Sequence, residues 1–308
     1  MKESSISKII GGTEEERKEA EKLFGNAFRE QRMFKSIEHE KTPDELKLLL
    51  AVDNLTSEIA KNYGAKEPAS VLPDNVHIVD KEILKKLFLD EFKMEAKKNL
   101  SGFFSMRSQA VFVIEGQNIN ELLYLVAHEM YHFKGYGSFQ VKKSPEGEAR
   151  YAQRRGGWGI VMPKRKQNAF QDMDEAVTDM LTAKTISGIV DQVDNIGISK
   201  EIADEIKNKY QEDPEAAYYL GYVFEKERLW DLLTEIYRKN KDRFENIDDV
   251  FDLFAKTIFT GKLINVARLI EKTFGKGSFR KIGEDGLPKT ETEKEIDKEL
   301  EDMEKEVN

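Results

Sequence analysis

The sequence predicts an α+β protein that is mostly helical, and three observations lead to this fold class. Apolar residues recur with a helical period over most of the 308 residues. Between residues 76 and 162 the pattern changes to short apolar and β-branched runs, which predict a small sheet of about three to five strands. The hydrophobic fraction of 39% is enough to bury a core in a chain of this length.

The N-terminal region, residues 1–70, is predicted to be helical. Thr13 and Glu16 have the spacing of a capping box, which predicts a helix that runs to about residue 40. A second capping box begins at Thr42 and has Pro43 at the first helical position, so a second helix is expected to about residue 63. A linker that contains two prolines then leads to the sheet.

Residues 71–190 are predicted to form the core, in which helices cover a small mixed sheet. One helix is expected from Asp80 to about residue 98, and another from Asn118 to Gly135. The Gly-Gly pair at 156–157 predicts the turn of a hairpin. The predicted strands are Val76–Val79, Gly102–Ser105, Ala110–Ile114, 151–155 and 158–162, and residues 138–141 are a further candidate.

The remaining chain divides into a helical region, residues 191–283, and a charged tail, residues 284–308. Asp213 and the proline after it predict a helix start. The tail holds eleven Asp and Glu against four Lys, so it carries most of the net charge of -9. An acidic chain is a poor electrostatic partner for nucleic acid, so no nucleic-acid partner is expected.

The chain has no apolar stretch near the ~18 residues that a membrane span needs. Its first residues also lack the apolar segment of a signal peptide. We therefore expect no membrane span and a cytoplasmic protein, although a protein exported by a leaderless route would have the same sequence features.

Cysteine is absent and histidine is scarce, which restricts the metal sites that the chain can build. Without thiols, a transition-metal site must use imidazole and carboxylate ligands. The histidines are His39, His77, His128 and His132.

The last two histidines belong to the segment VAHEMYHFKG, inside the helix expected from Asn118. His128 and His132 are four residues apart, so they project from one helix face and can reach one ion. Glu129 lies about 100° round the helix, where it can meet a metal-bound water without being a ligand. This is the H-E-x-x-H arrangement of zinc peptidases. The alternative is a pair of incidental histidines on an amphipathic helix.

A catalytic zinc needs a third protein ligand, which must be His39, His77 or a carboxylate. The metzincin pattern fails because position 138 is serine. Downstream, Glu175 and Asp179 are four apart on a segment with helical period. One carboxylate could bind the metal while the other accepts the second N–H of a ligand histidine. The alternative is an ordinary acidic first turn of a helix.

HEMYH at 128–132 followed by DEAVTD at 174–179 resembles the two-part signature of the gluzincin metallopeptidases, the thermolysin-like branch of the zincins. The resemblance covers about residues 102–185 and implies a zincin-like core with the mixed sheet packed on the H-E-x-x-H helix. It implies that His128, His132 and Glu175 bind one zinc ion, that Glu129 is the general base, and that Asp179 is the partner of a ligand histidine. The separation of 43 residues between His132 and Glu175 departs from the shorter spacing in thermolysin, so the hairpin region must loop out and return.

Two features of the family have no single match in the sequence. Ala110–Ile114 resembles the zincin edge strand to which a peptide substrate adds, but its continuous apolar run fits an interior strand equally well. The donor that assists the oxyanion is not assigned. The residues chemically able to serve are Tyr151, Tyr218, Tyr219, Tyr222, His77 and Arg154.

These features predict a zinc-dependent endopeptidase that acts on a protein or peptide substrate. A second hypothesis is a regulatory zincin-fold protein that binds zinc and a protein partner without turnover. The presence of Glu129 favours the enzyme, since metal binding alone does not require it. A third is a helical structural protein that binds no metal.

Overall fold

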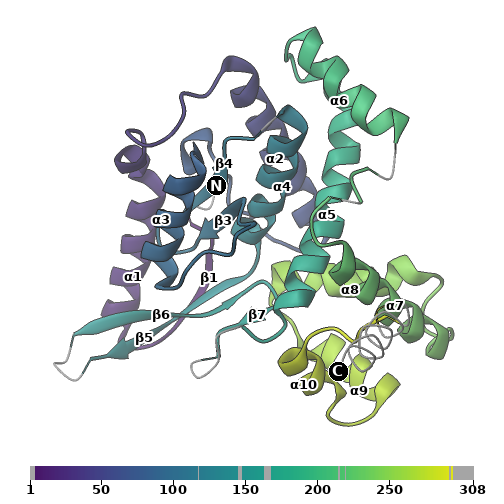
Figure 1. Cartoon of the computed structure of the whole chain (residues 1–308). Helices are drawn as coiled ribbons and strands as arrows, with labels where there is room; N and C mark the ends of the chain where they lie inside the picture. Colours follow the sequence, from purple (N-terminus) through teal and green to yellow (C-terminus); the bar gives the residue numbers. More distant parts are fainter. Residues whose placement is uncertain are drawn as a thin grey trace, which may run out of the picture.

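The structure is a computed structural model that describes residues 4–116, 118–144, 148–162, 168–213, 216–218, 220–290 and 293 (Figure 1). It confirms the α+β class, because the chain is 58% helical and carries two small mixed sheets. Ten α-helices lie within the described residues. Across these same ranges we find no helix with the length and hydrophobicity of a membrane span.

The first sheet has three strands in the order β2-β4-β3. β2 (Val76–Val79) runs parallel to β4 (Ala110–Ile114), and β3 (Gly102–Ser105) runs antiparallel to it. Two alternatives were open for Ala110–Ile114: the interior strand is confirmed and the edge strand is wrong, since β4 is the central strand and β2 and β3 lie at the two edges. The continuous apolar run of β4 is explained by burial on both faces.

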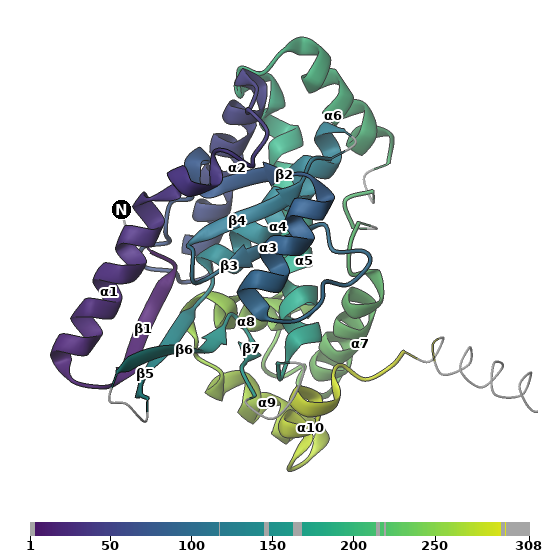
Figure 2. The same cartoon turned by 60° about the vertical axis from the view of Figure 1, so that its left-hand side comes forward.

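Helices on the two faces of this sheet produce that burial. α3 (Lys81–Phe92) packs on one face, where Leu84 joins Phe103 and Phe112 in a cluster. α4 (Ile119–Lys134) covers the other face and contacts both β3 and β4 (Figure 2). α3 ends at Phe92 rather than near residue 98, because Lys93 takes the left-handed conformation that terminates a helix.

The second sheet has the order β1-β5-β6-β7. The predicted hairpin is present as β6 (Ala149–Gly156) and β7 (Gly159–Ile160), and β5 (Gly137–Lys143) pairs antiparallel with β6. β1 (Ile6–Gly11) was not predicted. It is short and pairs in parallel with β5, more than 120 residues away, so no local pattern marks it.

α1 (Glu14–Arg29) covers one face of this second sheet, with Phe24 against Phe139 at 4.5 Å between ring centroids. The helix begins at the Thr13 capping box as predicted but stops at Arg29 instead of near residue 40. A 3₁₀ turn follows, in which the buried Gln31 side chain donates to the backbone carbonyl of Ser108. The α-helix thus gives way to a 3₁₀ turn at the point where Gln31 makes this tertiary contact.

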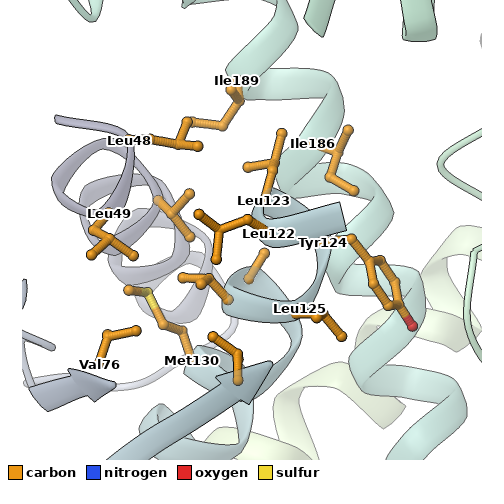
Figure 3. Packing of buried hydrophobic residues seen from close by; sticks show 14 of the residues in the cluster. Leu48, Leu49, Val76, Leu122, Leu123, Tyr124, Leu125, Met130, Ile186 and Ile189 are labelled. Carbon is orange, nitrogen blue, oxygen red and sulfur yellow. The ribbon is translucent and has the colours of Figure 1, made fainter. Parts of the chain in front are cut away.

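α2 (Pro43–Asn62) follows its capping box as predicted, and α4 lies between α2 and α5 (Gln171–Gln192) in the main core. Figure 3 shows the shared packing, in which residues of all three helices meet a strand end. The labelled members of this cluster are Leu48, Leu49, Val76, Leu122, Leu123, Tyr124, Leu125, Met130, Ile186 and Ile189.

The C-terminal part is helical as predicted, but the helix start at Asp213 is wrong. α6 (Lys200–Glu212) ends there and α7 (Val223–Lys239) begins ten residues later, after Gly221 has taken a left-handed conformation. The other helices are α8 (Ile247–Thr260), α9 (Ile264–Phe274) and α10 (Ser278–Asp285), with 3₁₀ turns at Gln31–Phe34, Pro73–Asn75 and Val193–Asn195. Most of the acidic tail lies outside the described residues.

Candidate metal centre

Two helices build the site, and each has a local reason for its position. The side chain of Asn118 caps the start of α4, and Gly135 ends it, so the H-E-x-x-H segment lies in the last two turns. α5 packs directly against α4. This packing places Glu175 opposite the two histidines, and Figure 1 shows the helices side by side.

One donor atom from each of His128, His132 and Glu175 converges on a common point. The two Nε2 atoms are 3.2 Å apart. Oε2 of Glu175 lies 3.2 Å from the Nε2 atom of His128 and 3.4 Å from that of His132. Ligands bonded at about 2.0–2.1 Å in a tetrahedral site are about 3.3–3.4 Å apart, so the three atoms have the spacing needed to hold one divalent ion.

The second nitrogen of each imidazole faces a carboxylate. Nδ1 of His128 lies 3.3 Å from Asp179, and Nδ1 of His132 lies 3.4 Å from Asp174. Because each Nδ1–H then donates to a carboxylate, the lone pairs of both Nε2 atoms point at one another and at Glu175. Such lone pairs repel each other, and a cation between them removes the repulsion. The donor set therefore fits a metal ion.

The electrostatics of the cluster also favour positive charge. Burial lowers the pKa of His128, but hydrogen bonds to Asp179 and Glu175 outweigh burial and raise this pKa to about 9. For His132, burial is outweighed by the charge of Glu175 and the hydrogen bond to Asp174, so its pKa is raised well above the ordinary value. Burial opposes ionisation of Glu175, yet the two histidines hold its pKa below the ordinary value.

Glu129 lies beside this cluster and is not one of the three converging groups. Its side chain is buried against the edge strand β3, where a Cβ added to Gly102 would be 3.3 Å from Cγ of Glu129. The backbone N–H of Phe104 donates to the Glu129 carboxylate. Burial is the main cause that raises the pKa of Glu129.

Among the candidate oxyanion donors, Tyr222 reaches the site. Its ring stacks on the imidazole of His128, with centroids 5.5 Å apart and planes 19° apart. Its hydroxyl donates a hydrogen bond to Glu175, and 38% of the residue's surface is exposed. The charge of Glu175 and then burial raise the pKa of Tyr222 above the ordinary value. The phenol therefore stays protonated and can donate.

Within the described residues, the other candidate oxyanion donors do not reach the cluster of His128, His132 and Glu175. His77 is buried on β2 between Glu38 and Gln31. Tyr151 and Arg154 belong to β6, and Tyr151 packs on α1 through Phe24. Tyr218 carries the Nζ atom of Lys226 over its ring, and Tyr219 lies outside the described residues.

His39 also lies away from the cluster, where its imidazole shares a hydrogen bond with Glu45 in the α2 cap.

Comparison with known protein families, curated proteins and solved structures found no significant match. The chemistry of the site is therefore inferred from its own atoms.

Sequence reasoning missed Asp174. This carboxylate precedes Glu175 in the first turn of α5, where an acidic residue has an ordinary explanation in the helix dipole. A signal was nevertheless present, because two ligand histidines need two Nδ1 acceptors and Asp179 can serve one of them. The second acceptor had to be another carboxylate or carbonyl near the same helix.

Proposed function

We propose that this protein is a zinc-dependent metallopeptidase in which His128, His132 and Glu175 hold the metal. The observation that carries the proposal is the convergence of three donor atoms, 3.2–3.4 Å apart, with both Nδ1 atoms oriented by carboxylates. Two imidazoles and one carboxylate are a common ligand set of catalytic zinc, and this set leaves one position open for water.

Zinc held there supplies a Lewis acid that makes water nucleophilic near neutral pH and polarises the substrate carbonyl. We assign the proton transfer to Glu129, whose carboxylate takes a proton from the attacking water and gives it to the leaving amine. Its raised pKa suits this role, because a carboxylate that titrates closer to neutrality can both accept and return a proton.

Tyr222 is the proposed donor to the negative oxygen of the tetrahedral intermediate. Its phenol lies over His128, the residue is partly exposed, and the hydroxyl keeps its proton. A donor that is already in place when charge develops stabilises the transition state at little reorganisation cost. Asp174 and Asp179 would hold the two imidazoles in the tautomer that presents Nε2 to the metal.

β3 is the proposed docking strand for the substrate, in place of β4. It is one of the two edge strands of its sheet, and it is the one that runs antiparallel to β4 and has Gly102 and Phe104 against Glu129. A peptide that adds to this edge uses backbone hydrogen bonds, which carry little sequence preference. Such a mode suits an endopeptidase of extended or unfolded protein segments.

The same elements support the resemblance to the gluzincins and a zincin-like core. A mixed sheet with an antiparallel edge strand packs on the H-E-x-x-H helix, and a second helix carries the glutamate four residues before Asp179. The inserted residues between His132 and Glu175 form β5, β6 and β7 and return to the start of α5.

The test combines metal analysis with cleavage of an unfolded protein, comparing wild type with Glu129→Gln. We expect about one zinc ion per chain in both proteins and cleavage by wild type alone. Full activity in Glu129→Gln would refute the assigned base. Zinc binding by a wild type that cleaves nothing would instead support the regulatory zinc-binding protein, and a purified protein free of zinc would refute both.

A further inference from the structure

Asp179 is bound by more groups than a partner of one histidine requires. Besides Nδ1 of His128, the carboxylate accepts the Tyr124 hydroxyl at 2.6 Å and the backbone N–H of Tyr222 at 3.3 Å. Its Oδ2 atom also lies 2.6 Å from Nζ of Lys226, and both of these side chains are fully buried. Asp179 thus connects α4, α5 and the segment that leads into α7.

Lys226 has no exposed surface, and each proton of its ammonium group has an acceptor. One contact goes to Asp179, and the others go to the backbone carbonyls of Tyr218 and Leu220. An ammonium group has three protons to donate, so these three acceptors satisfy it. A buried charge is tolerated only when paired in this way. The lysine therefore ties the segment before α7 to the carboxylate behind His128.

Gly221 shows how closely that segment approaches the site. Its φ angle is +68°, in the left-handed region, and an added Cβ would lie 1.6 Å from the Tyr124 hydroxyl oxygen and 3.0 Å from Oδ1 of Asp179. Only glycine fits here. The next residue is Tyr222, which stacks on His128. The backbone contacts of Lys226 and the left-handed Gly221 together determine where this tyrosine lies.

We propose that Lys226 is a positioning residue of the metal centre: its contact with Asp179 and its hold on the segment before α7 orient the His128 imidazole and place Tyr222 over it. This inference rests on the proposed metal centre. Lys226 is fully buried and contacts none of the three converging donor atoms, so it acts only through Asp179 and the backbone at 218 and 220–222. The sequence offers no sign of this role, because Lys226 is an ordinary polar residue in the first turn of an amphipathic helix.

The test is a double-mutant cycle on zinc affinity with Lys226→Met, Asp179→Asn and the double variant in the full chain. Lys226→Met is expected to weaken zinc binding about 10-fold to 100-fold, as does loss of other groups that orient a ligand histidine. In the Asp179→Asn background, Lys226→Met should weaken zinc binding less than about twofold. The reason is that Lys226 acts through Asp179, so its effect is already lost there. The matched control is Lys239→Met on the same helix, an exposed lysine that should leave zinc affinity unchanged.

Cobalt bound in place of zinc supplies a second measurement, because its visible absorption depends on ligand geometry. Lys226→Met should change this spectrum, and Lys239→Met should not. If Lys226→Met does not fold, Gly221→Ala disturbs the same segment without removing a charge, and it should also change the spectrum and weaken zinc binding.

Equal losses of zinc affinity in the wild-type and Asp179→Asn backgrounds would overturn the proposal, since Lys226 would then not act through Asp179. Wild-type affinity and spectrum in Lys226→Met, or in Gly221→Ala where that variant serves as the substitute, would also overturn it. Absence of zinc from the wild-type protein would refute the metal centre itself. Peptidase activity is not needed for either measurement, so a zinc protein without cleavage would refute the proposed function and still test this inference.

Discussion

Oδ2 of Asp174 lies 3.4 Å from Nδ1 of His132, while Oδ1 of the same carboxylate accepts the backbone N–H of Trp158 at 2.7 Å. The second contact fixes the carboxylate, and the fixed carboxylate orients the imidazole. Gly157 precedes Trp158 and has φ +53°, and an added Cβ there would lie 2.2 Å from Oδ1 of Asp174. The turn between β6 and β7 is thus part of the support of His132.

We therefore expect Asp174→Ala to weaken zinc binding about 10-fold to 100-fold, because His132 loses the acceptor that holds its tautomer and ring orientation. Zinc affinity measured by competition with a chelating dye gives the comparison. The control is Asp172→Ala, two residues before Asp174 in the first turn of α5. This variant should bind zinc as wild type does. Wild-type affinity in Asp174→Ala would show that the contact with His132 is incidental.

Removal of the proposed zinc ion should destabilise the protein, because zinc held by the three converging groups would bind the folded chain and the unfolded chain has no assembled site. At a free zinc concentration 100 times Kd, the linkage contributes about 2.7 kcal/mol to the free energy of unfolding. Thermal unfolding with zinc and with EDTA measures this difference. Glu175→Ala should lose most of the zinc-dependent shift in Tm, whereas Glu129→Gln should keep it. A shift that survives in Glu175→Ala would remove this residue from the ligand set.

Tyr222→Phe should lower kcat about 10²-fold to 10³-fold while leaving zinc content unchanged, since it removes one donor to the developing oxyanion and no metal ligand. KM should change little if the phenol acts only in the transition state. Steady-state cleavage of a peptide substrate separates the two constants. Tyr237→Phe is the matched control, because this half-buried tyrosine of α7 donates its hydroxyl to the carbonyl of Glu245 and makes no contact with the site. Activity of Tyr222→Phe equal to wild type would leave the oxyanion donor to be sought elsewhere.

The metal-free protein should lose stability as the pH rises from about 6.5 to about 9. The pKa of His128 in the folded chain is raised to about 9 by Asp179 and Glu175 against the opposing effect of burial. Protonation therefore favours the folded state, and this contribution is complete below pH 6.5 and is lost as the pH passes through 9. Zinc affinity should rise over the same interval, because zinc must displace that proton.

The measurement is the free energy of unfolding in EDTA as a function of pH, taken as the difference between wild type and His128→Gln. This difference should decrease with rising pH across the interval. A difference that grows instead would contradict the direction of the pKa shift. The subtraction cancels other titrating groups such as Lys134, whose pKa is lowered to about 8 mainly by burial and whose effect has the opposite sign.

Several elements could be predicted because their causes are local. α2 begins at its capping box, and α4 begins and ends at the residues that cap it. The H-E-x-x-H pair needs only a helix to bring His128 and His132 onto one face. The strands β2, β3 and β4 also agree with their predicted bounds, because short apolar runs between turn residues indicate strands directly.

Errors occurred where a distant contact overrides a local pattern. The sequence predicts that the first helix continues to about residue 40. In the structure α1 stops at Arg29, and the Gln31 side chain donates a hydrogen bond to the backbone carbonyl of Ser108. β1 exists through its pairing with β5. The apolar run of β4 shows burial on both faces but not the order of strands, so only the sheet itself reveals that β3 is at the edge.

The sequence by itself determined the α+β class, the helix that carries His128 and His132, and the pairing of Glu175 with Asp179 four residues on, since helix geometry translates spacing into a shared face. Only the tertiary structure decided that Glu175 meets both Nε2 atoms, that Asp174 lies at Nδ1 of His132, and that Tyr222 stacks on His128 while Lys226 contacts Asp179. These contacts join helices and turns far apart in the chain. Their formation depends on how α5 and α7 pack against α4, and no spacing within one segment specifies that packing.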